Sequence, residues 1–381
     1  MLKENKSKIF SMSGFCFVIK IHDGNFAAIT MSSVLKIFLG KKPFNCLKQK
    51  QIEKTKTELY NIKEIFIKND HLNLSKNENN YINIKDKKIY FICYAKDILI
   101  FSFENNYQKC FLIQKIINNN YIGALIQLND KNIIFWDKKN TINLLIYLNE
   151  KKPYFQNEII QPKLNNKKIN SYILSFAEFE KNNIITTSTN KHPLGENAIR
   201  IYKIENMNNK NSKLINYKNF IGYSCSIFEN NIIKFENKKT ICIALNYYIK
   251  NNIIFNNSSI LFINYEYLEI TTILEINYSV NSIFNFFLIS KEGNNKIYEY
   301  IIISQFKSKD NNKTKKKGND NYRFLDFYIF DPKYEYDPLL IEEKRIETKS
   351  SIDITNSFIL NEINLLIFQT DQISIYDLLT K

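Results

Sequence analysis

Histidines, cysteines and glycine-rich loops are the usual sources of catalytic or metal chemistry, and this chain offers few usable patterns of them. Its three histidines, His22, His71 and His192, are far apart, and none has a second ligand at metal-binding spacing. A zinc site or a histidine base would have to be assembled wholly by tertiary contacts. No phosphate-binding glycine loop and no nucleophile-elbow pattern occurs in the sequence. We therefore predict no metal, no cofactor and no catalytic residue, and expect the protein not to be an enzyme.

The six cysteines are spaced neither as zinc ligands nor as a redox pair, since no Cys-x-x-Cys occurs. Several lie inside apolar runs, as Cys242 does between Ile241 and Ile243. A free cysteine in such a run behaves as a small hydrophobic core residue. This usage predicts a reducing compartment, the cytoplasm or the nucleus.

Positive charge is the second possible source of chemistry. The formal net charge is +15, and almost all the basic residues are lysines, with Arg200, Arg323 and Arg345 as the exceptions. A functional basic face more often recruits arginine, whose planar fork grips phosphate with two hydrogen bonds. Abundant Lys, Asn, Ile, Phe and Tyr is what an AT-rich genome produces. We interpret the charge mainly as compositional, with an anionic partner as the open alternative.

The densest basic segment is residues 307–321, which carries no apolar residue to bury. Low-complexity, charged sequence of this kind predicts a disordered loop between two strands. We predict that the loop supplies an electrostatic contact to a protein partner, with a merely solvated insertion as the alternative. Weak contact with nucleic acid or anionic lipid also stays open, although the loop has no aromatics for base stacking. The candidate binding residues are Lys307, Lys309, Lys313, Lys315, Lys316 and Lys317.

The elements that would carry these residues repeat along the chain. Seven strand-like runs each end in, or close to, an aromatic, at intervals of 46 to 63 residues. Each interval holds about four strands with their loops, which is one blade of a β-propeller. We therefore predict an all-β fold, a seven-bladed β-propeller. The repeated aromatics are Phe38, Phe101, Tyr147, Tyr202, Tyr265, Tyr328 and Tyr376.

The two ends of the chain complement each other. Residues 351–358, 364–368 and 373–378 are predicted as three strands of the last blade, which therefore lacks its outer strand. Residues 7–12 form a surplus strand-like run before the first inner strand. We predict that this N-terminal strand completes the last blade and closes the ring, which would remove an exposed edge. Residues 1–381 would then be one domain.

Two of the runs resemble the WD-repeat family of β-propellers. Residues 371–378 are similar to that family's turn and third strand, with Tyr376 in the usual tryptophan position and Asp377 in the aspartate position. Residues 199–204 match the same pattern without the aspartate, and the family's Gly-His dipeptide is missing from every unit. The resemblance extends over the whole chain at the level of strand spacing. It implies a protein-interaction scaffold, a subunit of a larger assembly whose partners are other proteins.

Two other propeller functions stay open as alternatives, an RNA- or ribonucleoprotein-associated propeller and a phosphoinositide-binding propeller of the autophagy type. The second is defined by two adjacent arginines before a glycine, and this chain has no Arg-Arg pair. The tempting dipeptide Trp136-Asp137 is not a WD signature, because the register places it in a second strand. Trp136 is instead predicted to be a buried aromatic.

Two polar segments interrupt the repeat, and no segment is predicted to cross a membrane. The lysine-rich residues 41–57 are expected to form an insertion with, at most, a short helix, and residues 307–321 form the second insertion. The most apolar window, residues 270–290, is broken by Glu275 and three asparagines, which would be costly to bury in lipid.

Overall fold

The structure of the protein is a computed structural model. Every secondary-structure element that it describes is a β-strand. The described residues are 6–11, 15–30, 32–40, 46–51, 61–67, 88–104, 106–137, 141–148, 154–160, 172–189, 198–205, 212–225, 232–235, 239–250, 253–255, 258–276, 279–289, 297–307, 322–330, 340–348, 354–360, 364–369 and 372–377.

The described strands form seven antiparallel sheets, each an open row of strands rather than a barrel. The first contains β2 (Phe15–Lys20), β3 (Phe26–Thr30), β4 (Val34–Phe38) and β5 (Cys46–Gln51). The second contains β6 (Asn61–Ile65), β7 (Ile89–Tyr94), β8 (Ile98–Glu104) and β9 (Lys109–Ile116). The third contains β10 (Ile122–Gln127), β11 (Ile133–Asp137), β12 (Ile142–Tyr147) and β13 (Phe155–Ile160). The fourth contains β14 (Tyr172–Glu180), β15 (Asn183–Thr189), β16 (Ala198–Glu205) and β17 (Lys213–Ile221).

The fifth sheet is irregular, because β18, β19 and β21 all pair with one long strand, β20. It contains β18 (Tyr223–Cys225), β19 (Ile232–Phe235), β20 (Thr240–Lys250), β21 (Ile253–Phe255), β22 (Ser259–Asn264) and β23 (Glu269–Glu275). The sixth contains β24 (Ser279–Ile289), β25 (Ile297–Lys307), β26 (Tyr322–Phe330) and β27 (Leu340–Thr348). The seventh combines β28 (Ile354–Leu360), β29 (Asn364–Gln369) and β30 (Gln372–Asp377) with β1 (Lys6–Ser11).

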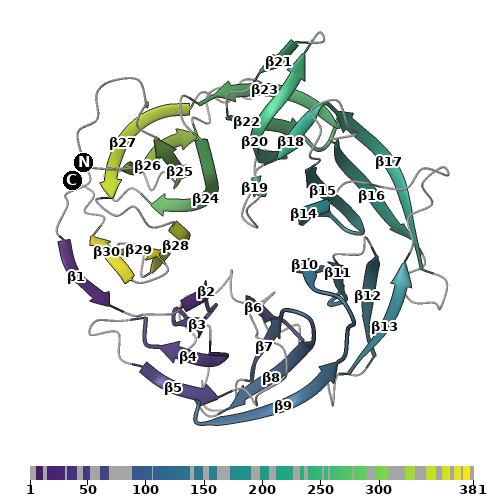
Figure 1. Cartoon of the computed structure of the whole chain (residues 1–381), viewed down its shortest axis with the longest axis vertical. Coiled ribbons are helices and arrows are strands. Elements are labelled where there is room, and N and C mark those ends of the chain that lie inside the picture. The colour runs from purple at the N-terminus through teal and green to yellow at the C-terminus, as the bar shows by residue number, and fades with distance from the viewer. Residues whose placement is uncertain are drawn as a thin grey trace, which may run out of the picture.

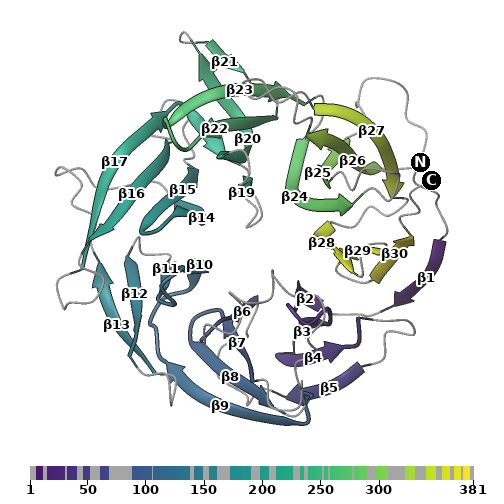
Figure 2. The same ribbon diagram turned by 180° about the vertical axis from the view of Figure 1, so that it is seen from behind.

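The sheets follow one another around a common centre, as the colour sequence in Figure 1 and the reverse view in Figure 2 show. Outside the fifth and seventh sheets the strand nearest the centre is the first of its sheet, and in the seventh it is β28, so β2 contacts both β6 and β28, and β24 contacts β28. In the fifth sheet this place belongs to β19, which contacts β14 and β24. At the outside of the seventh sheet, β1 pairs with β30, with Lys6 opposite Tyr376 and Ile9 opposite Ser374. The arrangement is that of a β-propeller, with strands from both ends of the chain in one sheet.

The core consists of layers between neighbouring sheets, which explains why the second and third strands are continuously apolar. In β7, Phe91 and Cys93 pack into a cluster shared with the first sheet. The alternate residues Tyr90 and Ile92 pack into a cluster shared with the third sheet. Because side chains of a strand alternate between its two faces, a strand buried on both faces needs apolar residues at every position.

The repeated aromatics lie on, or directly after, the third strand of seven different sheets. Phe38, Phe101 and Tyr202 are buried there. At these three residues, and likewise at Tyr328 and Tyr376, the pairing with the outer strand shifts by one residue, a β-bulge. The prediction of an all-β repeat built on these aromatics is confirmed.

The structure confirms the strand predicted for Trp136 and contradicts the insertion predicted for residues 41–57. Trp136 lies in β11, the second strand of the third sheet, and is 1% exposed. By contrast, residues 46–51 of the expected insertion form the outer strand β5. The expectation of an insertion or short helix is wrong there, because an outer strand contacts a neighbour on one edge only and can be polar throughout. The rest of 41–57 lies outside the described residues.

Candidate functional site

The turn between β2 and β3 is built by side chains that bond back to the main chain. Asp23 accepts hydrogen bonds from the main-chain N–H of Asn25 at 3.0 Å and from its side-chain Nδ2 at 2.9 Å. Asn25 Oδ1 accepts the N–H of Gly40 at 2.9 Å, which ties the turn to the end of the third strand. Gly24 has a φ of 85°, the left-handed region that glycine adopts without strain.

The turn between β10 and β11 repeats this construction. Asp130 accepts from the main-chain N–H of Asn132 at 3.0 Å and from its Nδ2 at 2.7 Å. Asn132 Oδ1 accepts the N–H of Tyr147 at 2.8 Å, and Lys131 has a φ of 75°. The shared Asp-x-Asn pattern therefore sets the same turn in the first and third sheets.

Each of these turns is also bonded to a glutamate on the first strand of the next sheet. The main-chain N–H of His22 donates to Glu64 Oε2 at 3.0 Å, from the first sheet to the second. The N–H of Asn129 donates to Glu178 Oε2 at 2.6 Å, from the third sheet to the fourth. His22 and Asn129 occupy the same position, directly before the turn aspartate. Both contacts join the ends of neighbouring inner strands.

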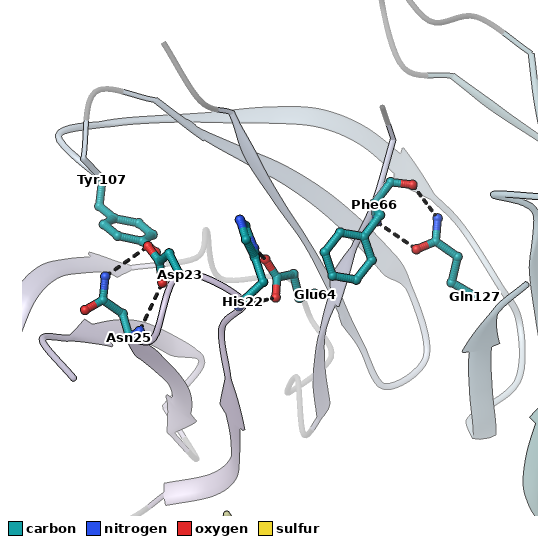
Figure 3. A network of polar contacts seen from close by, with 7 residues as sticks. All are labelled: His22, Asp23, Asn25, Glu64, Phe66, Tyr107 and Gln127. Carbon is teal, nitrogen blue, oxygen red and sulfur yellow. Dashed lines mark hydrogen bonds and ion pairs between the residues drawn. The ribbon is translucent and has the colours of Figure 1, made fainter. Parts of the chain in front are cut away.

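The first of these contacts belongs to a larger group, the inner-turn cluster, which Figure 3 shows. The imidazole Nδ1 of His22 pairs with the other oxygen of Glu64, and the two side chains are 15% and 8% exposed. The His22 ring also packs edge-on against Phe66, with 5.8 Å between ring centroids. The inner-turn cluster comprises His22, Asp23, Asn25, Glu64, Phe66, Tyr107 and Gln127.

Two further contacts extend the inner-turn cluster across sheet junctions. The hydroxyl of Tyr107, in the turn between β8 and β9, donates to Asp23 Oδ2 at 2.5 Å. Burial of the phenol, and then the charge of Asp23, raise the pKa of Tyr107 far above its usual value, so that it stays a neutral donor. Gln127 accepts the main-chain N–H of Phe66 at 2.7 Å and donates to the carbonyl of the same residue at 2.9 Å.

In the third and fourth sheets, burial disfavours the charged form of two carboxylates, Asp130 and Glu178. Burial raises the pKa of Asp130, although hydrogen bonds from Asn132 oppose it. Burial also raises the pKa of Glu178, with a smaller contribution from the charge of Asp130. Main-chain donors from Asn182 and Asn129 oppose that rise. These groups hold strands together at the cost of burying charge.

The inner-turn cluster holds neighbouring sheets together, because nearly every one of its contacts joins two sheets or closes a turn. No group of three or more His, Cys, Asp or Glu side chains that could hold a metal occurs among the described residues. His22 thus has an acidic neighbour that sequence spacing did not indicate. His71 and His192 lie outside the described residues. The repeated Asp-x-Asn at 23–25 and 130–132 was the sequence signal that could have pointed to the turns.

The predicted basic site falls largely where the structure gives no description. Lys307 is the last residue of β25 and lies opposite Tyr322 of β26, so it belongs to a strand and not to the loop. This corrects the boundary of the segment, because main-chain pairing with β26 continues through Lys307. The other five candidates, Lys309, Lys313, Lys315, Lys316 and Lys317, lie outside the described residues, between β25 and β26 along the chain.

Two of the described cysteines occupy the positions expected of free core residues. Cys93 and Cys242 are buried, and both are free thiols. Burial raises the pKa of the Cys93 thiol well above its usual value, so it stays protonated.

Within the described ranges, no helix is long and apolar enough to cross a membrane.

Comparison with known proteins agrees with the fold. No protein family matches the sequence, and no curated protein is similar to it. The structure of Sqt1 from Saccharomyces cerevisiae is similar with a TM-score of 0.54 and 9% identity, over 94% of this chain and 82% of that one. The WD40 domain of SCAP from fission yeast gives a TM-score of 0.48 and 10% identity, over 96% of this chain and 82% of that one. The chain has a β-propeller fold similar to that of Sqt1.

Proposed function

We propose that this chain is a non-enzymatic scaffold that binds other proteins, as one subunit of a larger complex in a reducing compartment. The observation that carries the proposal is a set of large apolar side chains left in solvent on the outer strands. Phe111 and Leu112 of β9 are 47% and 50% exposed, and Tyr217 and Ile221 of β17 are 57% and 69% exposed. Large exposed apolar side chains on outer strands are surface that a protein partner would bury.

The proposal is tested by affinity purification of the full chain followed by mass spectrometry. A scaffold predicts stoichiometric protein partners that stay bound at moderate salt, because buried apolar contacts are not screened. An RNA-associated propeller predicts loss of the bound material with nuclease and a steep dependence on salt. A lipid effector predicts binding to vesicles only when they contain acidic lipid. Recovery of the chain alone from a native extract would contradict the scaffold function.

The scaffold is proposed to be a single domain, a seven-bladed ring that β1 closes. The pairing of β1 with β30 and the contact of β2 with β28 support this arrangement. Deletion of residues 1–12 would leave the edge of β30 without its partner, and unpaired edges promote aggregation. We expect the truncated protein to aggregate or to melt well below the parent. Equal melting of the two proteins in calorimetry would contradict closure by the N-terminal strand.

The lysines between β25 and β26 are proposed to attract the partner rather than to fix its identity. Six lysines stand against one acid in residues 307–317. Such charge mainly accelerates association and is screened within about 8 Å at physiological salt. Replacing Lys313, Lys315, Lys316 and Lys317 with Ser should leave folding intact and slow capture of the partner at low salt. Capture at the parent's rate by the folded variant would return the segment to a solvated insertion.

A further inference from the structure

The outer strand of a sheet carries an edge that another strand could join. Its outward N–H and C=O groups are unpaired, and proteins usually protect them with a β-bulge or with lysines. Among the described outer strands, six show the one-residue register shift of a bulge against the third strand. These strands are β1, β5, β9, β17, β23 and β27.

Strand β13 has neither protection. Each of its residues lies opposite one residue of β12, from Ile160 opposite Ile142 to Phe155 opposite Tyr147, without a shift. Its sequence, Phe-Gln-Asn-Glu-Ile-Ile, contains no lysine or arginine. Of the other outer strands, β23 also lacks a basic residue, but it is bulged. The third sheet therefore presents an edge without a bulge, and Figure 1 shows β13 on the outside of its sheet.

A side chain identifies which main-chain groups of β13 point outward. The amide of Gln114, from β9 in the preceding sheet, accepts the N–H of Phe155 at 2.8 Å and donates to the carbonyl of Phe155 at 2.8 Å. Both groups of Phe155 therefore point away from β12. Because bonded and non-bonded pairs alternate along an antiparallel ladder, the groups of Asn157 and Ile159 point the same way. Within the described part of the chain, no hydrogen bond reaches those outward groups.

Gln114 also shows what kind of group this edge accepts. Its amide offers one acceptor and one donor to a single residue, which is what a residue of an added strand would offer. The next two positions along the edge are spaced for the same exchange by a main chain. Gln156 and Asn157 are exposed and uncharged, so no fixed charge on them opposes the approach of another strand. The hydroxyl of Ser212, directly before β17, donates to Glu158 Oε2 at 3.1 Å.

We propose that the edge of β13 binds an extended segment of a partner protein, which joins the third sheet as a fifth strand. The segment exchanges main-chain hydrogen bonds with Asn157 and Ile159, beyond the position that Gln114 already fills. Affinity in this mode comes from the main chain, and the alternate side chains of the segment supply specificity. The partner is therefore a β-prone, proline-free peptide. This inference rests on the proposed scaffold function and specifies the form of one partner.

Asn157→Pro tests the inference within the full-length protein. Proline removes the outward N–H of residue 157 and leaves the bonds of β13 to β12, which use the alternate residues. Asn157→Thr is the matched control, because threonine favours strands and keeps the N–H. Melting curves of both variants establish that they fold. Modified peptides supply a second measurement that leaves the protein unchanged.

The probe is a ten-residue peptide selected from a random displayed library on the parent protein, then synthesised with a fluorescent label. By anisotropy, N-methylation at every second residue should weaken binding about tenfold, whereas methylation of the intervening residues should change it little. Asn157→Pro should weaken binding by a similar factor, and Asn157→Thr by less than about twofold. This alternation is the signature of strand addition.

Three outcomes would overturn the inference. The first is a library that gives no peptide with this alternating sensitivity, or peptides that bind Asn157→Pro as well as the parent. The second is a dimer in sedimentation that the proline variant abolishes, since the occupant would then be a second copy of the chain. The third is recovery of the same natural partners by the parent and the proline variant. That result would contradict strand addition at β13 but not the proposed scaffold function. If the parent itself recovers no partner, the scaffold function is contradicted instead.

Discussion

The turns β2–β3 and β10–β11 make the same hydrogen bonds with different residues at their most constrained positions. Within these two turns, the residue with positive φ is Gly24 in the first and Lys131 in the second. The turn asparagine accepts the N–H of Gly40, two residues after the third strand β4, in the first sheet. In the third sheet it accepts the N–H of Tyr147, the last residue of the third strand β12. Gly40 packs directly against Gly24, whereas the Nζ of Lys131 lies 5.8 Å from the centroid of the Tyr147 ring.

This difference separates what the turn needs from what fills the space beside it. The aspartate and asparagine set the main-chain path, and they are the same in both turns. The residue at positive φ and the residue bonded to the turn asparagine have to fit each other. Gly24 fits against Gly40 in the first sheet, and Lys131 lies over the ring of Tyr147 in the third. A cation over a ring contributes about 0.5–1 kcal/mol at an exposed site, so the second solution partly offsets the strain at Lys131. Repeated geometry therefore does not require repeated residues.

Gly40→Ala should produce the largest effect on this comparison. A Cβ added at Gly40 would lie 1.7 Å from the carbonyl oxygen of Gly24, so the main chain itself would have to move. We expect a loss of about 3 kcal/mol in the free energy of unfolding, measured by urea denaturation. Gly24→Ala is the control, because a Cβ there meets nothing within 4 Å and only the positive φ is strained. That control should lose about 1 kcal/mol. Equal losses would mean that the two glycines do not act as a pair.

The repeat and the strands could be predicted because they depend on patterns that are local in the sequence. The register of the sequence alone predicts that Trp136 lies in a second strand, and the structure confirms it. The contacts between sheets could not be predicted in this way. Glu64 is 42 residues from His22, and Glu178 is 49 residues from Asn129. Which glutamate reaches a given turn depends on how two sheets are placed side by side.

Strand β5 shows the other limit of sequence patterns. Its sequence, Cys-Leu-Lys-Gln-Lys-Gln, lacks the apolar alternation that identifies a half-buried strand. An outer strand is held mainly by main-chain pairing with β4, which any residue except proline can supply. The basic segment had the opposite problem, because its composition is distinctive but five of its six lysines lie outside the described residues. Composition alone therefore identified the segment but not a site.

Removing the glutamates should distinguish the two inter-sheet contacts. Glu64→Ala deletes the acceptor of the His22 N–H and the partner of its imidazole, and we expect a loss of about 2 kcal/mol. Glu178→Ala also frees two main-chain donors, but burial of its charge is costly in the parent, so the loss should be smaller. Urea denaturation at pH 7 measures both. A larger loss from Glu178→Ala than from Glu64→Ala would contradict the expectation that Glu64 stabilises its pair of sheets more.

The pH dependence of stability should sharpen the same contrast. The pKa of Glu178 is raised in the folded protein, so the folded state binds a proton more readily than the unfolded chain. Its contribution therefore becomes more favourable as the pH falls from 7 through the raised pKa, and levels off near the ordinary value of about 4.3. Glu178→Gln should remove this part of the pH dependence. Parent and variant curves that stay parallel between pH 7 and pH 4.5 would count against a raised pKa.

Lys131→Gly should have the smallest effect, because opposing contributions nearly cancel. Glycine relieves about 1 kcal/mol of strain at positive φ. It also loses the contact of the Lys131 ammonium with the Tyr147 ring, and it gives the unfolded chain more freedom, by about 0.5–1 kcal/mol each. These contributions leave a net loss between zero and about 1 kcal/mol in urea denaturation, no larger than the loss expected from Gly24→Ala. A loss above about 1.5 kcal/mol would show that the lysine–tyrosine contact, rather than the turn asparagine, holds the second turn to its third strand.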